Sequence, residues 1–288
     1  MLKVRAYAKI NLTLDVLHKR SDGYHEVAMV MQAIDLFDTV QLQKQNGDIT
    51  LEANIPALAC DGSNLAYKAA ALLKDRCDIN EGVHISLQKN IPLAAGLAGG
   101  SANAAAVLKG LNSLWQLGLT QSELEELGAL LGSDIPFCLR GGTMLSTGRG
   151  EILTPLPQLP VCYVVLAKPD ICVSTAKVYG AYSGARVIKH PDTQGMLRSL
   201  ERQDIQGVAD RLCNVLESVT VFDYPVIDEI KQAMRRCGVM NSLMSGSGPT
   251  VFGLTADAER ATYVASELAK QFGDKTNIIV AKTLAGVE

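Results

Sequence analysis

The pattern of residues indicates an α+β protein. The chain begins with one long alternating strand, has a glycine-rich loop between a strand and a helix, and carries a proline-rich segment near its middle. Strands and helices mix on both sides of that segment without a strict βαβ repeat, which favours α+β over a parallel α/β architecture. The 288 residues suffice for two ordinary domains or one large one.

In the first half, apolar and polar residues alternate from Val4 to Val16, which predicts a strand. Further strands are predicted over residues 27–34, 49–53 and 83–88. Helices are predicted over residues 64–74, 104–115 and 120–131. The last of these opens with a capping box, Thr120-x-x-Glu123, and a Gly-Ser-Asp segment at 132–134 ends it.

The segment with Pro155, Pro157 and Pro160 is the best candidate for a domain boundary. We therefore expect one domain over residues 1–155 and a second over 156–288. Beyond the boundary, strands are predicted over residues 161–167, 251–254 and 278–281. Helices are predicted over residues 225–237, with Gly238 after the C-terminal cap, and over 257–272.

Charge and composition exclude several classes of protein. The net charge of −3 argues against nucleic acid and against anionic membranes as partners. No apolar run reaches the roughly 18 residues of a spanning helix, and we expect no signal peptide. The seven scattered cysteines contain no C-x-x-C pair, which favours a reducing cytoplasm over a zinc or disulfide framework. We expect most of them to be small buried hydrophobic residues.

The segment 92–103 is the most informative in the chain. It contains Gly96, Gly99 and Gly100 between a predicted strand and a predicted helix. Free amides and the positive end of a helix dipole would make it a site for a phosphate group. The alternative is a plain turn with Ser101 as the N-cap. The sequence lacks both G-x-x-x-x-G-K-[ST] and G-x-G-x-x-G at this place, which excludes the common P-loop and the dinucleotide-binding loop.

Two pairs of residues near the N-terminus are candidates for binding a ligand. Lys9 and Asn11 share one face of the first strand, where they could meet an anion or a substrate hydroxyl. A solvated outer face is the interpretation that the strand alone favours. Tyr24 and His25 follow a turn, so an aromatic ring and an imidazole could bind a planar base together, although such a pair is more often structural.

Two later segments are also candidates. Asp134 follows a helix end among apolar neighbours, so it is either a base towards a hydroxyl or the cap of the next turn. The small residues from Ser245 to Thr250 would allow a backbone to approach a ligand closely. A mobile turn is the alternative there, but the apolar flanks suggest a loop that is held.

Taken in order, these segments resemble the GHMP family of small-molecule kinases. Residues 8–12, the loop at 92–103 and residues 244–252 match the three motifs of that family. Residues 20–25 and 132–137 are similar to the members whose substrate carries a cytidine diphosphate. The resemblance extends over nearly the whole chain.

The resemblance implies a two-domain GHMP kinase fold, with an N-terminal domain like ribosomal protein S5 and a ferredoxin-like C-terminal domain. It implies ATP-dependent phosphorylation of a hydroxyl on a small cytidine-diphosphate substrate, with Mg²⁺ as a second cofactor. It further implies a bacterial cytoplasmic enzyme that is a monomer or homodimer and binds neither nucleic acid nor membrane.

The resemblance also assigns roles to residues. The catalytic pair is Lys9 and Asp134. The ATP-binding residues are Asn64, Pro92, Leu93, Ala94, Ala95, Gly96, Leu97, Ala98, Gly99, Gly100, Ser101 and Ala102. The substrate-binding residues are Asn11, Tyr24, His25, Tyr179, Gly246, Ser247 and Gly248. No residue is assigned as a dedicated metal ligand. Ala98 and Ala102 replace a glycine and a serine that are frequent in the family, so one hydroxyl contact to phosphate or magnesium is in doubt.

Three alternatives remain on the same fold. A sister kinase for homoserine, mevalonate or a sugar would have no use for the Tyr24-His25 pair. A sensor that binds ATP without chemistry would not need both Lys9 and Asp134. An ATP-assisted decarboxylase would need an arginine cluster for a carboxylate, and the sequence offers no such cluster.

Overall fold

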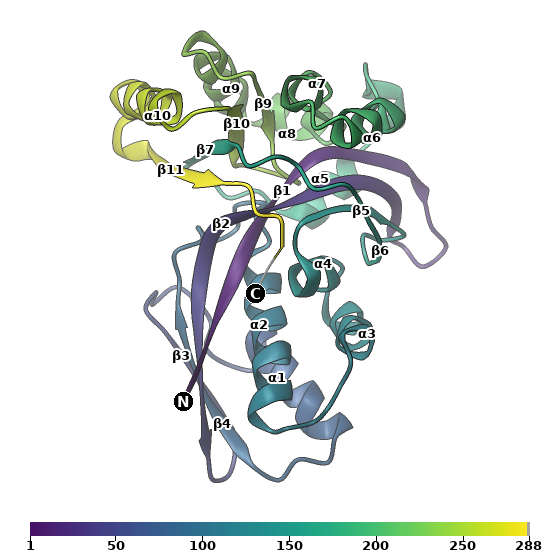
Figure 1. The fold of residues 1–288 in the computed structure, drawn as a ribbon, viewed down its shortest axis with the longest axis vertical. Helices are drawn as coiled ribbons and strands as arrows, with labels where there is room; N and C mark the ends of the chain where they lie inside the picture. The colour runs from purple at the N-terminus through teal and green to yellow at the C-terminus, as the bar shows by residue number, and fades with distance from the viewer. Residues whose placement is uncertain (287–288) are drawn as a thin grey trace.

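The computed structural model describes residues 1–286, which form two β-sheets with helices packed against each (Figure 1). The seven strands of the first sheet in this range are β1 (Leu2–Lys19), β2 (His25–Gln45), β3 (Ile49–Ala53), β4 (Gly82–Gln88), β5 (Thr143–Thr147), β6 (Ile152–Pro155) and β8 (Cys213–Asn214). Their central order is β3-β4-β2-β1-β8; off this path, β5 pairs with β2, and β6 pairs with β5. β1 and β2 are long antiparallel strands that extend towards both halves of the molecule.

Four helices lie on one side of the first sheet. They are α1 (Leu65–Arg76), α2 (Gly99–Leu114), α3 (Gln121–Leu131) and α4 (Ile135–Arg140). Asn64 caps α1 by accepting a hydrogen bond from the Ala66 amide at 2.9 Å, and Thr120 and Glu123 form the predicted capping box of α3. Buried alanine and leucine side chains of α1 and α2 pack against the sheet and form this half's core.

The second sheet has the order β11-β7-β10-β9 and is antiparallel throughout. Its strands are β7 (Tyr163–Pro169), β9 (Asn241–Met244), β10 (Val251–Thr255) and β11 (Thr276–Lys282). The remaining helices are α5 (Thr175–Ala181), α6 (Thr193–Glu201), α7 (Ile205–Asp210), α8 (Glu217–Asp223), α9 (Val226–Arg236) and α10 (Ala258–Phe272), with short 3₁₀ turns at Gly184–Arg186 and Gly273–Lys275. Helices α9 and α10 pack on this sheet, which gives the ferredoxin-like arrangement implied by the resemblance.

The division at residue 155/156 stays a prediction. Two later segments join the first sheet: Cys213 and Asn214 pair in parallel with β1, and Thr283 forms a bridge with Ile34. In the described range, residues 1–286, there is no helix long and apolar enough to cross a membrane. The expectation that most cysteines are buried is wrong: two are buried and two are exposed, and the other three are partly buried. The buried ones are Cys162 and Cys213, the exposed ones Cys60 and Cys172, and the partly buried ones Cys77, Cys138 and Cys237.

The predicted solvated face of the first strand is wrong. Lys9 is 4% exposed and Asn11 is fully buried. The apolar side chains Ile10 and Leu12 pack in a cluster that includes Leu166 of the second sheet. Because the second half of the chain covers that face, the opposite face with Lys9 and Asn11 turns towards the glycine loops rather than to bulk water.

The interpretation of Ser101 as a helix N-cap is also wrong. The N-cap of α2 is Ala98, in the left-handed conformation with φ 58°, and the helix begins directly at Gly99. The first helical hydrogen bond joins the Ala102 amide to the Ala98 carbonyl at 2.8 Å. Ser101 therefore lies inside the first turn of the helix, where its own amide is free of helical bonding.

Candidate active site

A cavity of about 840 Å³ lies between the two halves of the molecule. It collects most of the predicted site residues: Lys9, Asn11, Tyr24, His25, Pro92, Leu93, Ala94, Ala95, Gly96, Ala98, Gly99, Gly100, Ser101, Asp134, Tyr179, Gly246 and Ser247. The other four are not part of its lining. Leu97 and Ala102 are 1% exposed in the core, Asn64 caps α1, and the Gly248 amide donates to the Ser245 carbonyl at 2.9 Å.

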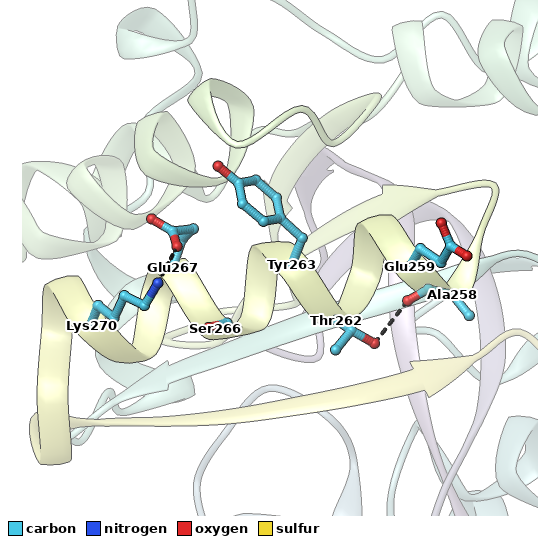
Figure 2. A pocket seen from close by; sticks show the side chains of 7 residues that line it. All are labelled: Ala258, Glu259, Thr262, Tyr263, Ser266, Glu267 and Lys270. Atoms are coloured by element: carbon cyan, nitrogen blue, oxygen red, sulfur yellow. Dashed lines mark hydrogen bonds and ion pairs between the residues drawn. The ribbon is translucent and has the colours of Figure 1, made fainter.

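A second, shallow hollow follows the outer face of α10 (Figure 2). Its lining comes from that one helix, and its polar groups bond within the helix. The Thr262 hydroxyl donates to the Ala258 carbonyl at 2.9 Å, and Lys270 pairs with Glu267 at 2.7 Å. None of the predicted site residues lies there, so the cavity between the halves is the candidate site.

Lys9 and Asp134 meet at the centre of this cavity. The Lys9 ammonium lies 3.7 Å from Asp134 Oδ2, 2.8 Å from Asn11 Oδ1 and 3.2 Å from the Gly96 carbonyl oxygen. The lysine is buried, whereas the Asp134 side chain is 30% exposed and faces the cavity. Asp134 occupies the N-cap position of α4, and in the described structure its carboxylate makes no capping bond. An ionised carboxylate beside a buried ammonium can accept a proton from a bound hydroxyl.

The glycine loop presents backbone groups to the cavity. Ala94 (φ 49°), Gly96 (φ 73°) and Ala98 (φ 58°) all have left-handed backbones, and the residues between them have negative φ. Such alternation turns successive amides to one side and forms a concavity suited to an anion. The first-turn amides of α2, at residues 99–101, lie at the same wall and carry the positive end of the helix dipole. This arrangement fits a polyphosphate.

The late glycine loop packs directly against the first one. The Ser245 hydroxyl donates to the Gly96 carbonyl at 3.0 Å, and a Cβ on Gly96 would lie 2.3 Å from the Ser245 carbonyl oxygen. Asn214 of β8 donates to the carbonyls of Met244 and Gly246, both at 2.8 Å. The loop is thus held from two sides, as its apolar flanks suggested.

The far end of the cavity is aromatic. The ring centroid of His25 lies 5.5 Å from that of Tyr179 and 6.4 Å from that of Tyr182. Burial, and secondly the charge of Lys19, lower the pKa of His25 from its ordinary 6.5, so the imidazole is neutral at pH 7. Burial also raises the pKa of the Tyr179 phenol, with a smaller contribution from Asp134. Tyr24 is exposed, and the Arg149 guanidinium lies 5.0 Å from its ring centroid. These flat faces and a neutral imidazole suit a planar base.

Several residues of the site were not found from the sequence. Arg149 lies within the turn between β5 and β6, Thr175 and Tyr182 lie at the two ends of the short helix α5, and Asn214 lies in an apolar stretch. Thr175 reaches the late glycine loop through a 2.8 Å contact between its hydroxyl and that of Ser247. Only the polar character of Asn214 among apolar neighbours could have drawn attention to it, because polar groups in such surroundings need a partner.

The donor groups also suit a nucleotide with its cation. Asp134 and Ser101 offer oxygen atoms at the cavity wall, which is the ligand type that Mg²⁺ prefers. Among the residues that the structure describes, no group of three or more His, Cys, Asp or Glu side chains gathers as a metal site.

Comparison with known proteins agrees with this geometry. Residues 64–142 match the N-terminal domain of GHMP kinases, and residues 196–274 match their C-terminal domain. The 4-diphosphocytidyl-2-C-methyl-D-erythritol kinase of Geobacillus kaustophilus (strain HTA426) is 56% identical over 255 residues, which is 88% of each chain. The protein of that name from Alkaliphilus oremlandii is 49% identical over 90% of this chain and 89% of its own.

Solved structures give the same grouping. The crystal structure of a 4-(cytidine 5'-diphospho)-2C-methyl-D-erythritol kinase superimposes with a TM-score of 0.83 at 32% identity, covering 98% of this chain and 99% of that one. Homoserine kinase from Cytophaga hutchinsonii shares the fold, with a TM-score of 0.76 at 20% identity over 99% and 96% of the two chains. The chain belongs to the GHMP kinase family, and the 4-diphosphocytidyl-2-C-methyl-D-erythritol kinases are its near relatives within that family.

Proposed function

We propose that the chain transfers the γ-phosphate of ATP to the 2-hydroxyl of 4-diphosphocytidyl-2-C-methyl-D-erythritol, a step in the non-mevalonate route to isoprenoid precursors. One observation carries this proposal. A single cavity joins a phosphate-binding backbone to an aromatic base site with a neutral imidazole. Lys9 contacts the first through Gly96, and Asp134 lines the same cavity as Tyr179 of the second. The names of the near relatives support the same substrate.

In the proposed mechanism, Asp134 accepts the proton of the acceptor hydroxyl as that oxygen attacks the γ-phosphorus and ADP departs. Lys9 lies beside this carboxylate and stabilises the negative charge that develops on the oxygen. The amides at residues 99–101 bind the phosphates at the positive helix end. Mg²⁺, held by Asp134, Ser101 and the nucleotide's own oxygens, would neutralise phosphate charge.

The roles of the remaining site residues follow from their positions relative to the cavity. Tyr24, His25 and Tyr179 bind the cytosine ring, and Asn11 lies beside the acceptor next to Lys9. Gly246 and Ser247 line the substrate side, with Gly248 supporting them from behind. Pro92, Leu93, Ala94 and Ala95 continue the phosphate loop, Leu97 and Ala102 anchor it in the core, and Asn64 acts on the nucleotide side through α1. We place the enzyme in the bacterial cytoplasm as a monomer or homodimer.

The assay combines the purified chain with ATP, Mg²⁺ and each of four acceptors: the cytidine substrate, homoserine, mevalonate and galactose. ADP release and ³¹P NMR of the product report transfer. We expect a new phosphomonoester from the cytidine substrate alone. Transfer to homoserine, mevalonate or galactose instead would establish a sister kinase, and ATP binding without transfer to any acceptor would establish a sensor.

The mechanistic part has its own test in Asp134→Asn. The amide keeps the shape of the carboxylate but cannot accept the proton, so we expect kcat to fall about 10²–10⁴-fold, the usual contribution of a general base. A substrate KM within a few fold of wild type would show that the site is intact. An Asp134→Asn enzyme with the full wild-type rate would contradict the assigned role.

A further inference from the structure

A buried charge cluster lies beside the phosphate loop, outside the groups used by the mechanism, and its Lys89 also lines the cavity. It consists of Asp38 of β2, Lys89 just after β4, and Asn103 in α2, which are 0%, 5% and 2% exposed. The Lys89 ammonium forms an ion pair with Asp38 Oδ2 and donates to Asn103 Oδ1 at 2.8 Å. The Asn103 amide donates to the same Asp38 oxygen at 2.9 Å. The three side chains therefore form a closed triangle.

The second oxygen of Asp38 binds the backbone where the loop begins. Asp38 Oδ1 accepts hydrogen bonds from the Asn90 amide at 2.7 Å and the Ile91 amide at 2.8 Å. Its Oδ2 meanwhile binds Asn103, which lies early in α2, the helix that follows the phosphate loop. One carboxylate thus joins the entry of the phosphate loop to the helix in which the loop ends.

Stability alone is a weak reason for such a cluster. Removing two charges from water costs several kcal/mol per ion, and well-packed apolar residues often replace a buried ion pair without loss. What a fully bonded buried network does provide is rigidity and a single arrangement. The loop needs this, because Ala94 and Ala98 hold left-handed backbones that non-glycine residues adopt only when their surroundings impose them.

Lys89 also contacts the start of α2. A Cβ on Gly99 would lie 3.3 Å from the Lys89 ammonium nitrogen and 3.0 Å from a methyl carbon of Ile91. The ammonium therefore lies close to Gly99, the first residue of the helix. Because its charge is balanced by Asp38, the cluster acts on a bound phosphate through the position of the loop rather than through its net charge.

We propose that Asp38, Lys89 and Asn103 are positioning residues for ATP, which fix the two ends of the phosphate loop so that the amides of residues 99–101 are arranged before the triphosphate binds. This inference rests on the proposed function of the loop. The cluster should therefore affect the affinity for the nucleotide but not the affinity for the cytidine substrate.

The first test is Asn103→Ala, which removes the link to the start of α2 and leaves the Asp38–Lys89 pair in place. We expect the KM for ATP to rise about 10-fold, while the KM for the cytidine substrate stays within twofold of wild type. The Asp38→Asn/Lys89→Met double variant removes both charges, keeps similar volume and should show the same split. Thr143→Val is the control, because it deletes a buried hydroxyl that donates to Gln32 at 2.6 Å outside the cavity wall, and both KM values should stay unchanged.

A folded Asn103→Ala or double variant whose two KM values rise together, or whose ATP KM is unchanged, would overturn the proposal. If neither variant folds, hydrogen exchange of the wild-type chain decides. The Asn90 and Ile91 amides should be protected without ATP, and unprotected amides would contradict a preset loop. Calorimetric binding of a non-hydrolysable ATP analogue tests positioning even if the wild-type chain fails to phosphorylate the cytidine substrate, so the two proposals can fail separately.

Discussion

The two ends of the cavity are built from different parts of the chain. The phosphate end is backbone from two glycine loops, and buried contacts such as that between Ser245 and Gly96 hold these loops together. The base end consists of the side chains of Tyr24, His25 and Tyr179: the His25 ring contacts that of Tyr179, and the Arg149 guanidinium lies over that of Tyr24. Tyr24 is 54% exposed, whereas Ser245 is fully buried.

This difference separates what the fold does in general from what this chain does in particular. A phosphate group offers the same oxygens in every ATP-dependent reaction, so backbone amides can bind it without depending on side-chain identity. A base must be recognised by side chains, which can change without altering the fold. Homoserine and mevalonate kinases share this fold at 16–20% identity, as expected if the scaffold is retained while the acceptor end varies.

The largest expected effect comes from separating the two loops with Gly96→Ala. The new methyl group would lie 2.3 Å from the Ser245 carbonyl oxygen, at a residue with φ 73°. Overpacking and left-handed strain together should lower the free energy of unfolding by about 2–5 kcal/mol. A displacement of the loop by about 1 Å should reduce kcat/KM about 100-fold or more.

Gly118→Ala is the matched control for this change. Gly118 has nearly the same backbone, φ 71°, but open space around its Cα. It should therefore lose about 1–2 kcal/mol through strain alone and keep its activity. Thermal melting and steady-state kinetics of both variants separate packing from strain, and equal activity in the two would show that the contact between the loops does not matter.

Much of the phosphate end could be predicted from the sequence, because its signals are local. The glycines at 96, 99 and 100 are adjacent in the chain, and the strand before them and helix after them have clear periodicity. The start of α2 was misplaced because Ala98 is left-handed, and an alanine gives no sequence signal for that conformation. Alternation in β1 showed two faces but could not show that the second sheet would cover one of them.

The supporting residues could not be found in this way. Asp38 is 51 residues from Lys89 and 65 from Asn103, and the three side chains interact only because the sheet and α2 bring them together. Asn214 and Arg149 depend on long-range packing in the same manner. At the base end, the Tyr24-His25 pair was visible as a pattern, but its substrate came from the resemblance to a family and not from the physics of two rings.

A smaller effect, limited to the base end, is expected from Tyr179→Ala. Loss of stacking on a base costs about 1–3 kcal/mol, so the KM for the cytidine substrate should rise about 5- to 150-fold. The KM for ATP should not change, because Tyr179 lies against His25 and not against the phosphate loop. Tyr179→Phe keeps the ring and should stay within a few fold of wild type. A parallel rise in both KM values would contradict the proposal that the two ends of the cavity bind different ligands.

The smallest effect concerns pH at the same end. The pKa of His25 lies below 6.5 because the ring is partly buried and Lys19 is near. A bound base would cover the imidazole further and add to this desolvation, so the neutral form should bind the substrate more tightly. We expect kcat/KM for the cytidine substrate to be flat from about pH 7 to 8 and to fall a few fold as the pH drops through the lowered pKa.

The stability of the folded chain should change with pH in the same direction as kcat/KM. Below pH 6.5 this histidine becomes protonated in the unfolded chain, while its lowered pKa disfavours protonation in the folded chain. The unfolded state therefore binds more protons, and stability decreases as the pH falls. His25→Gln removes the titrating group, and its substrate KM should rise while the pH dependence of kcat/KM above the carboxylate range disappears. Since we propose that ATP binds at the other end, affinity for an ATP analogue should not follow this titration. A His25→Gln enzyme that retains the full acid-side decline would assign the titration to another group, and the base end would then lack its neutral imidazole.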